Sequence, residues 1–198
     1  MQLGKTPREH VMDTITMVRD ARSKGLRVNI YLEDWSNGMK DSPDYVMYLM
    51  DRIRKEEIER FMLPDTLGIL DPYDTFDFVK RMVKTYPELR FDFHAHNDYD
   101  LAISNLFAAL KVGASGVHCT INGLGERAGN ASLSSSIAVI HDMLKLQTGI
   151  DVGGDVADAV LQVGIALFQL VLHLADVVKH SGMILAEFLA DIRQTEIG

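Results

Sequence analysis

Two histidines separated by a single residue are the strongest chemical signal in this 198-residue sequence. His94 and His96 end an apolar run that is typical of a β-strand. Because side chains alternate across a strand with a period of two, both imidazoles point to the same side and can reach one ion. Imidazole pairs of this kind suit zinc, manganese or iron, and carboxamide or carboxylate oxygens usually complete the shell. The spacing therefore predicts a divalent-metal site.

A loop further along the chain supplies the next candidate ligand. Residues 122–130 contain three glycines, which let the backbone adopt positive φ and approach a ligand closely. Asn130 at the end of this loop offers an amide oxygen to the same metal. We interpret Glu126 and Arg127 in the middle of the loop as an ion pair that locks it, rather than as catalytic residues.

Two polar residues after other strands are candidates for chemistry beside the metal. Glu33 either caps the turn that follows it or acts as a general acid or base facing the metal, and spacing alone slightly favours the cap. Thr66 either caps its own turn or donates its hydroxyl to a substrate carboxylate. His118 lies inside a predicted strand, so we expect it in the core or in the lining of a barrel.

The elements that must position these residues alternate along the chain. Helical periodicity, capping and turn signals predict helices over 7–23, 44–54, 72–86, 101–112 and 133–146, and strands over 26–32, 61–63, 90–96 and 116–121. The first helix begins with a capping box at Thr6 and Glu9 and has Pro7 at its first position. We expect residues 36–38, Ser-Asn-Gly, to form a turn.

Four successive strand–helix units imply parallel strands with right-handed crossovers, in an open sheet or in part of a closed barrel. In both architectures, chemistry collects at the carboxyl ends of the strands. All four groups of polar residues fall at such ends: Glu33, Thr66, the two histidines and the loop of Asn130. Their convergence on one face predicts an enzyme.

The composition excludes several other classes of protein. A hydrophobic fraction of 47% with 24% charged residues is typical of a globular domain, and the net charge of −8 argues against a nucleic-acid partner. A lone cysteine, Cys119, excludes an intrachain disulfide and, with no signal-peptide pattern, favours the cytoplasm. The apolar stretch 157–178 is too polar to span a membrane, and we predict that 151–198 is a helical C-terminal segment.

Two longer motifs cover residues 94–102 and 120–131. Together they closely resemble the signature of the 2-isopropylmalate, citramalate and homocitrate synthase family. The resemblance extends through 31–38 and 63–68, and so covers most of residues 1–150. It implies a metal-dependent (β/α)8 TIM barrel that joins the acetyl group of acetyl-CoA to a 2-oxoacid and then hydrolyses the thioester, which releases CoA. Residues 1–150 would then be a partial TIM-barrel catalytic domain, with about four units that match barrel strands five to eight.

The same resemblance implies a role for each candidate residue. His94, His96 and Asn130 match metal ligands, Glu33 matches a catalytic glutamate, and Thr66 matches a threonine near the 2-oxoacid carboxylate. The metal would be Mn²⁺, Mg²⁺ or Zn²⁺, and acetyl-CoA would be the cosubstrate. A 2-isopropylmalate synthase acting on 3-methyl-2-oxobutanoate in leucine biosynthesis is the first hypothesis, and a citramalate synthase acting on pyruvate in isoleucine biosynthesis is the alternative. Related lyases share the histidine pair but lack the sequence motif found here at residues 125–130.

One part of the family pattern is missing. The resemblance implies an Arg-Asp-Gly/Glu run on the family's first strand, whose aspartate would be the remaining metal ligand, and no such run follows a strand before residue 26. A half barrel exposes two sheet edges, so we expect a homo-oligomer or association with a complementing barrel half. We also expect no activity from this chain alone. A non-catalytic half barrel that serves as a binding or assembly module remains a further alternative.

Overall fold

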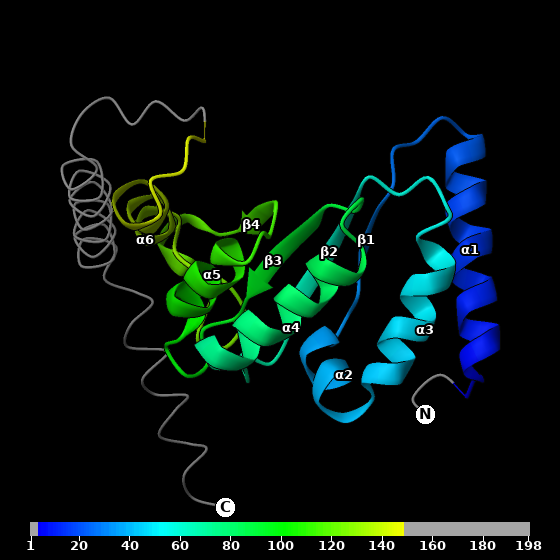
Figure 1. Cartoon of the computed structure of the whole chain (residues 1–198), viewed down its shortest axis with the longest axis horizontal. Coiled ribbons are helices and arrows are strands. Elements are labelled where there is room, and N and C mark those ends of the chain that lie inside the picture. The colour runs from blue at the N-terminus through cyan, green and yellow to red at the C-terminus, as the bar shows by residue number, and fades with distance from the viewer. Residues whose placement is uncertain (1–3, 149–198) are drawn as a thin grey trace, which may run out of the picture. The chain divides into compact units, whose positions relative to one another are not determined.

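The computed structural model describes residues 4–148, and every structural statement below concerns that part of the chain. The predicted helical segment 151–198 lies outside it. The described part alternates strands with helices (Figure 1). The strands are β1 (Asn29–Tyr31), β2 (Arg60–Asp65), β3 (Phe91–Ala95) and β4 (Gly116–His118). The helices are α1 (Pro7–Ser23), α2 (Trp35–Asp41), α3 (Pro43–Ile53), α4 (Pro72–Thr85), α5 (Ala102–Lys111) and α6 (Leu133–Ala138), with a 3-10 turn η1 (Ile121–Gly123) and a π-turn η2 (Val139–Met143).

The four strands form one parallel sheet in the order β1-β2-β3-β4. Strand order therefore follows chain order, as it does around a TIM barrel, whereas a doubly wound sheet reverses its order at a switch point. The prediction of a parallel α/β fold with about four units of a (β/α)8 barrel is confirmed.

The two faces of the sheet have opposite character. Phe61, Leu63 and Phe93 alternate onto the face that packs against the helices, and they belong to the buried core of the described residues. Residues one position away, such as Asp92 and His94, lie on the other face. Burying the apolar face under helices thus leaves a polar face free for chemistry.

Helix α1 begins and ends where the sequence predicts. The Thr6 hydroxyl accepts from the Glu9 backbone N–H at 3.3 Å, and the Glu9 carboxylate accepts from the Thr6 N–H at 2.7 Å. This reciprocal pair satisfies donors that the first turn of a helix leaves free. Val11, Ile15 and Val18 on one stripe are buried and fix the helix on the domain.

The prediction of a turn at residues 36–38 is wrong. These residues form the middle of helix α2, despite the low helix propensity of serine, asparagine and glycine. The reason is tertiary packing, because Trp35 and Met39 are buried and the Trp35 ring meets Phe78 edge-on at 6.3 Å. An apolar residue at each end therefore holds the helix against the core.

Other element boundaries differ less from the predictions. Strands β1 and β4 are shorter than expected, and the last predicted helix is α6 followed by the π-turn η2. Cys119 follows β4 and packs on the core, and burial raises the pKa of its thiol, as expected for an unreactive cysteine. Within residues 4–148, no helix combines the length and apolarity that crossing a membrane requires.

Candidate metal and substrate site

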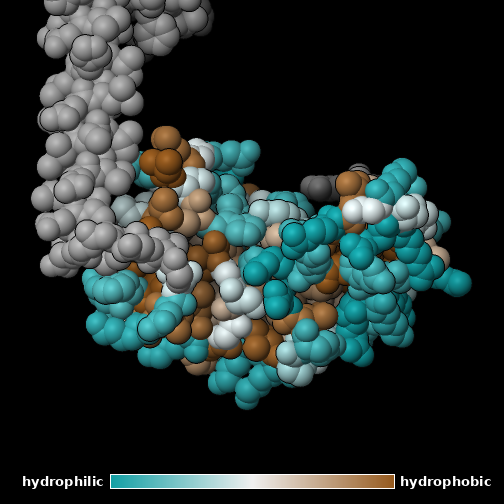
Figure 2. Space-filling view, turned by 90° about the horizontal axis from the view of Figure 1, so that it is seen from above, coloured by the Kyte–Doolittle hydropathy of each residue, from teal (hydrophilic) through white to brown (hydrophobic). Residues whose placement is uncertain are grey.

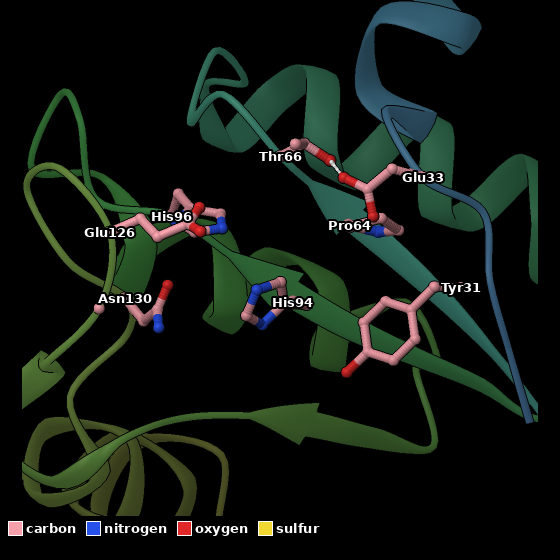
Figure 3. Close-up of a pocket in the computed structure, with 9 residues that line it drawn as sticks. Tyr31, Glu33, Pro64, Thr66, His94, His96, Glu126 and Asn130 are labelled. Carbon is pink, nitrogen blue, oxygen red and sulfur yellow. Dashed lines mark hydrogen bonds between the residues drawn. The ribbon is translucent and has the colours of Figure 1, made fainter. Parts of the chain in front are cut away.

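The five predicted site residues line one open cleft of about 380 Å³ at the carboxyl ends of the strands (Figure 3). Glu33 comes from the loop after β1, Thr66 from the loop after β2, and Asn130 from the loop between β4 and α6. His94 is on β3 and His96 directly follows it. Tyr31, Pro64, Gly125 and Glu126 complete the lining, and of these Tyr31 was not foreseen as a cleft residue.

The two histidines lie side by side, as their spacing predicts. Their ring centroids are 5.0 Å apart and the rings are nearly perpendicular, at 83°. Burial, followed by the neighbouring His96 and His118, lowers the pKa of His94 to about 4. His94 is therefore neutral over the physiological range, which is the form of imidazole that binds metals.

Asn130 reaches the same cleft from a tightly folded loop. An isolated bridge pairs its backbone with that of His96, and its N–H donates to the Gly123 carbonyl at 2.8 Å. Gly129, with φ of +94°, makes this turn possible, because a Cβ there would collide with the Gly123 carbonyl oxygen. The loop thus places an amide next to the histidine pair.

Three polar atoms in the cleft are buried and have no hydrogen-bond partner among the described residues: Nδ1 of His94, Nδ1 of His96 and Oδ1 of Asn130. Buried polar atoms in proteins are normally hydrogen-bonded, so three orphaned atoms on neighbouring side chains indicate a site for a ligand. Two imidazoles and one amide oxygen fit a divalent metal of the zinc or manganese type.

This donor set is an incomplete coordination shell. In residues 4–148, no three side chains of the His, Cys, Asp or Glu type are grouped so that they could hold a metal ion. Catalytic zinc sites commonly have three protein ligands, and His94, His96 and Asn130 reach that number only with the amide.

Glu33 and Thr66 contact each other directly. The Thr66 hydroxyl donates to Glu33 Oε1 at 2.8 Å and accepts from the Asp34 N–H at 3.0 Å. Neither residue caps its own turn: no side chain caps α2, and the turn after β2 is held by Asp65, which accepts from the backbone of Ile69 and Leu70. The capping alternative for Glu33 is therefore wrong, and its carboxylate faces the cleft.

The predicted ion pair between Glu126 and Arg127 is present, but Asp98 is the closer partner of the arginine. Arg127 lies 3.8 Å from Glu126, but it binds both carboxylate oxygens of Asp98 at 2.7 Å and donates to the Thr66 carbonyl at 2.8 Å. Arg127 also holds the pKa of Asp98 below its ordinary value. The arginine thus ties together the loops that follow β2, β3 and β4. The signal that could have found this contact is that all three loops meet at one end of the sheet.

The sequence model of the HMGL-like family matches residues 1–159, most of the chain. The chain belongs to the HMGL-like family. Among its curated relatives, 2-isopropylmalate synthase 2 of Caldanaerobacter subterraneus is 34% identical over 74% of this chain and 38% of its own length. Homocitrate synthase of Saccharolobus solfataricus is 36% identical over 75% of this chain and 31% of its own length.

The solved structures agree on the fold of this HMGL-like chain. Hydroxymethylglutaryl-CoA lyase from Pseudomonas aeruginosa superimposes with a TM-score of 0.66 and 20% identity, over 83% of this chain and 56% of the lyase. The chain spans about a third of the length of the two synthases above. The two curated relatives are named as synthases, whereas the solved neighbour is named as a lyase.

Proposed function

We propose that this chain supplies the metal-holding part of an acetyl-CoA-dependent condensing enzyme of the 2-isopropylmalate synthase type. The observation that supports the proposal best is the trio of unpaired donors on His94, His96 and Asn130 beside the Glu33–Thr66 pair. Sequence similarity to synthases named for 2-isopropylmalate and homocitrate supports the same reaction class.

The side chains of the cleft have separate tasks in this proposal. His94, His96 and Asn130 hold the metal, which when bound supplies the positive charge that polarises the keto carbonyl of the 2-oxoacid. The Glu33 carboxylate accepts a proton from the methyl group of acetyl-CoA, and general-base catalysis of this kind contributes roughly 10²- to 10⁴-fold to the rate in enzymes. The Thr66 hydroxyl, bonded to Glu33 at 2.8 Å, orients that carboxylate or turns to the carboxylate of the 2-oxoacid.

The ligand types favour some metals over others. Mg²⁺ prefers an all-oxygen shell, whereas two imidazole nitrogens suit Zn²⁺ or Mn²⁺ better. We therefore propose Zn²⁺ or Mn²⁺ ahead of Mg²⁺. For the 2-oxoacid, 3-methyl-2-oxobutanoate comes first and pyruvate second, and the partner is a second copy of the chain or a complementing barrel half.

Calorimetric titration with Zn²⁺ tests the metal site. We expect the full chain to bind one Zn²⁺ weakly, and we expect the double variant H94A/H96A to lose that binding. The control is H141A, because His141 is exposed and, among residues 4–148, its ring is hydrogen-bonded to Asp142 alone, at 2.8 Å. Zn²⁺ binding that survives the loss of both site histidines would contradict the proposal.

A thiol assay for CoA release tests the reaction. With acetyl-CoA and either 2-oxoacid, we expect no release by the chain alone, because its metal shell is incomplete. Release after a complementing barrel half is added, and its loss in the variant E33Q of the mixture, would support the condensing reaction. Turnover by the chain alone would contradict the requirement for a further ligand.

A further inference from the structure

A hydrogen bond of 2.8 Å joins Tyr31 Oη to His118 Nδ1 and crosses the whole polar face of the sheet. Tyr31 ends β1 and His118 ends β4, the two outer strands in the order β1-β2-β3-β4. Two strands separate them, so the side chains can meet only because the sheet is curved and both point to its concave face. The bond therefore spans the concave face in front of β3.

His94 lies against this bridge. Its ring centroid is 6.2 Å from that of Tyr31, with an interplanar angle of 82°, and 5.7 Å from that of His118. His118 is also the register partner of His94 on the neighbouring strand. The close-up of the cleft shows the phenol ring of Tyr31 next to His94 (Figure 3). The imidazole of His94 is thus enclosed by rings on two sides.

The second ring nitrogen of His118, Nε2, faces a carboxylate. Its Nε2 lies 3.8 Å from Asp92 Oδ2, and Asp92 Oδ1 accepts from Arg60 at 2.6 Å. A Cβ on Gly116 would come within 2.7 Å of that carboxylate, so the glycine leaves room for Asp92. A carboxylate beside Nε2 favours a proton on that nitrogen, which leaves Nδ1 of His118 to accept from the Tyr31 hydroxyl.

Metal-binding histidines usually donate their second ring nitrogen to a carboxylate, a carbonyl or water, which fixes the orientation of the ring. Within residues 4–148, neither ring nitrogen of His94 has a hydrogen-bond partner, and Nδ1 is buried. Its orientation must therefore come from packing. We propose that Tyr31 and His118 form a positioning pair that holds the His94 ring ready for the metal, an inference that rests on the proposed metal site.

Zn²⁺ affinity in three variants of the full chain tests the pair. Y31F removes only the hydroxyl, H118L removes the acceptor, and H118N keeps an acceptor where Nδ1 stands. Loss of groups that orient metal ligands typically costs about 10- to 100-fold in affinity. We expect Y31F and H118L each to weaken Zn²⁺ binding about tenfold, and H118N to restore most of it. Y73F and H141Q are matched controls, since Tyr73 is 83% exposed and His141 is exposed.

A double-mutant cycle separates positioning from general destabilisation. If the two side chains act through one hydrogen bond, Y31F/H118L binds Zn²⁺ no more weakly than either single variant. We also expect the visible absorption of the Co²⁺-loaded chain to shift in Y31F and H118L and to recover in H118N. Wild-type affinity and wild-type Co²⁺ spectra in both single variants would overturn the positioning role. Absence of Zn²⁺ binding in the wild-type chain would instead defeat the proposed metal site itself.

Discussion

At the scale of single residues, five polar side chains meet in one cleft because parallel strands end at the same edge of the sheet. They are Glu33, Thr66, His94, His96 and Asn130. Their roles remain predictions. The parallel sheet also predicts that the loop of Arg127 meets the loop of Asp98, but spacing along the chain singles out the adjacent Glu126 as the partner of the arginine.

The hydroxyl of Thr66 is expected to stabilise the fold as well as the site. T66V keeps the shape of the side chain but leaves the Asp34 N–H and the Glu33 carboxylate without this partner. We expect a loss of about 1 kcal/mol in the free energy of unfolding, measured by urea denaturation. The control T16V removes an exposed hydroxyl that bonds only within α1, and it should change stability by less than about 0.5 kcal/mol. Equal effects of the two substitutions would contradict the link between the loops.

At the scale of elements, the sequence predicted best where a local signal and the tertiary packing agree. Helix α1 has both a capping box and a buried stripe, and its bounds match the prediction at both ends. Helix α2 lacks any local signal and exists because Trp35 and Met39 are buried, so sequence patterns alone indicated a turn. Sequence patterns do not predict the Tyr31–His118 hydrogen bond either, since it depends on the curvature of the sheet.

The loop between β4 and α6 requires glycine at position 129 for two reasons: its positive φ and its close contact with the Gly123 carbonyl. G129A would force alanine into φ of +94° and push its Cβ against the Gly123 carbonyl. Gly25 offers a matched control, because its φ is +79° and a Cβ there would meet nothing within 4 Å. We expect G25A to cost about 1 kcal/mol and G129A more than about 2 kcal/mol in urea unfolding. Equal losses of unfolding free energy in the two variants would show that the contact with the Gly123 carbonyl does not affect stability.

The contact between α3 and α4 is expected to weaken at high pH. Tyr86 follows α4, is 1% exposed and donates to Asp51 of α3 at 3.1 Å; burial first, then this contact, raises its pKa to about 12. The unfolded chain ionises this phenol near its ordinary pKa of 10.0, while the folded chain resists ionisation. The stabilisation is therefore complete below pH 10 and is lost as the pH rises toward 12.

Urea unfolding across this alkaline range measures the effect. Two pKa units correspond to roughly 2 to 3 kcal/mol, which the wild-type chain should lose and Y86F should not. Y73F is the control, because Tyr73 is exposed and its ionisation should not depend on folding. An alkaline loss of the same size in Y86F would contradict the assignment to Tyr86.

At the scale of the whole molecule, the described part is a sheet with two open sides. No strand of residues 4–148 pairs with the outer side of β1 or of β4. Hydrophobic residues are also exposed among hydrophilic ones on one face of the described part (Figure 2). Exposed strand edges and apolar patches favour association, so the prediction of an oligomer or a complementing half stands as a proposal.

Sedimentation velocity over a range of protein concentrations tests this expectation. We expect species larger than the 22.1 kDa monomer, with a fraction that rises with concentration. Addition of a complementing barrel half should replace self-association by a defined heterodimer. A single monomeric species at every concentration would contradict the expectation.

His94, His96 and Asn130 all belong to the continuous stretch that runs from β3 through α5 and β4 to the following loop. Their separations along the chain are smaller than the 87 residues between Tyr31 and His118, and smaller separations cost less loop-closure entropy. Tyr31 joins from a separate strand 87 residues away from His118. The donors thus come together within one supersecondary unit, whereas their final orientation requires the sheet to be assembled from its first strand to its last.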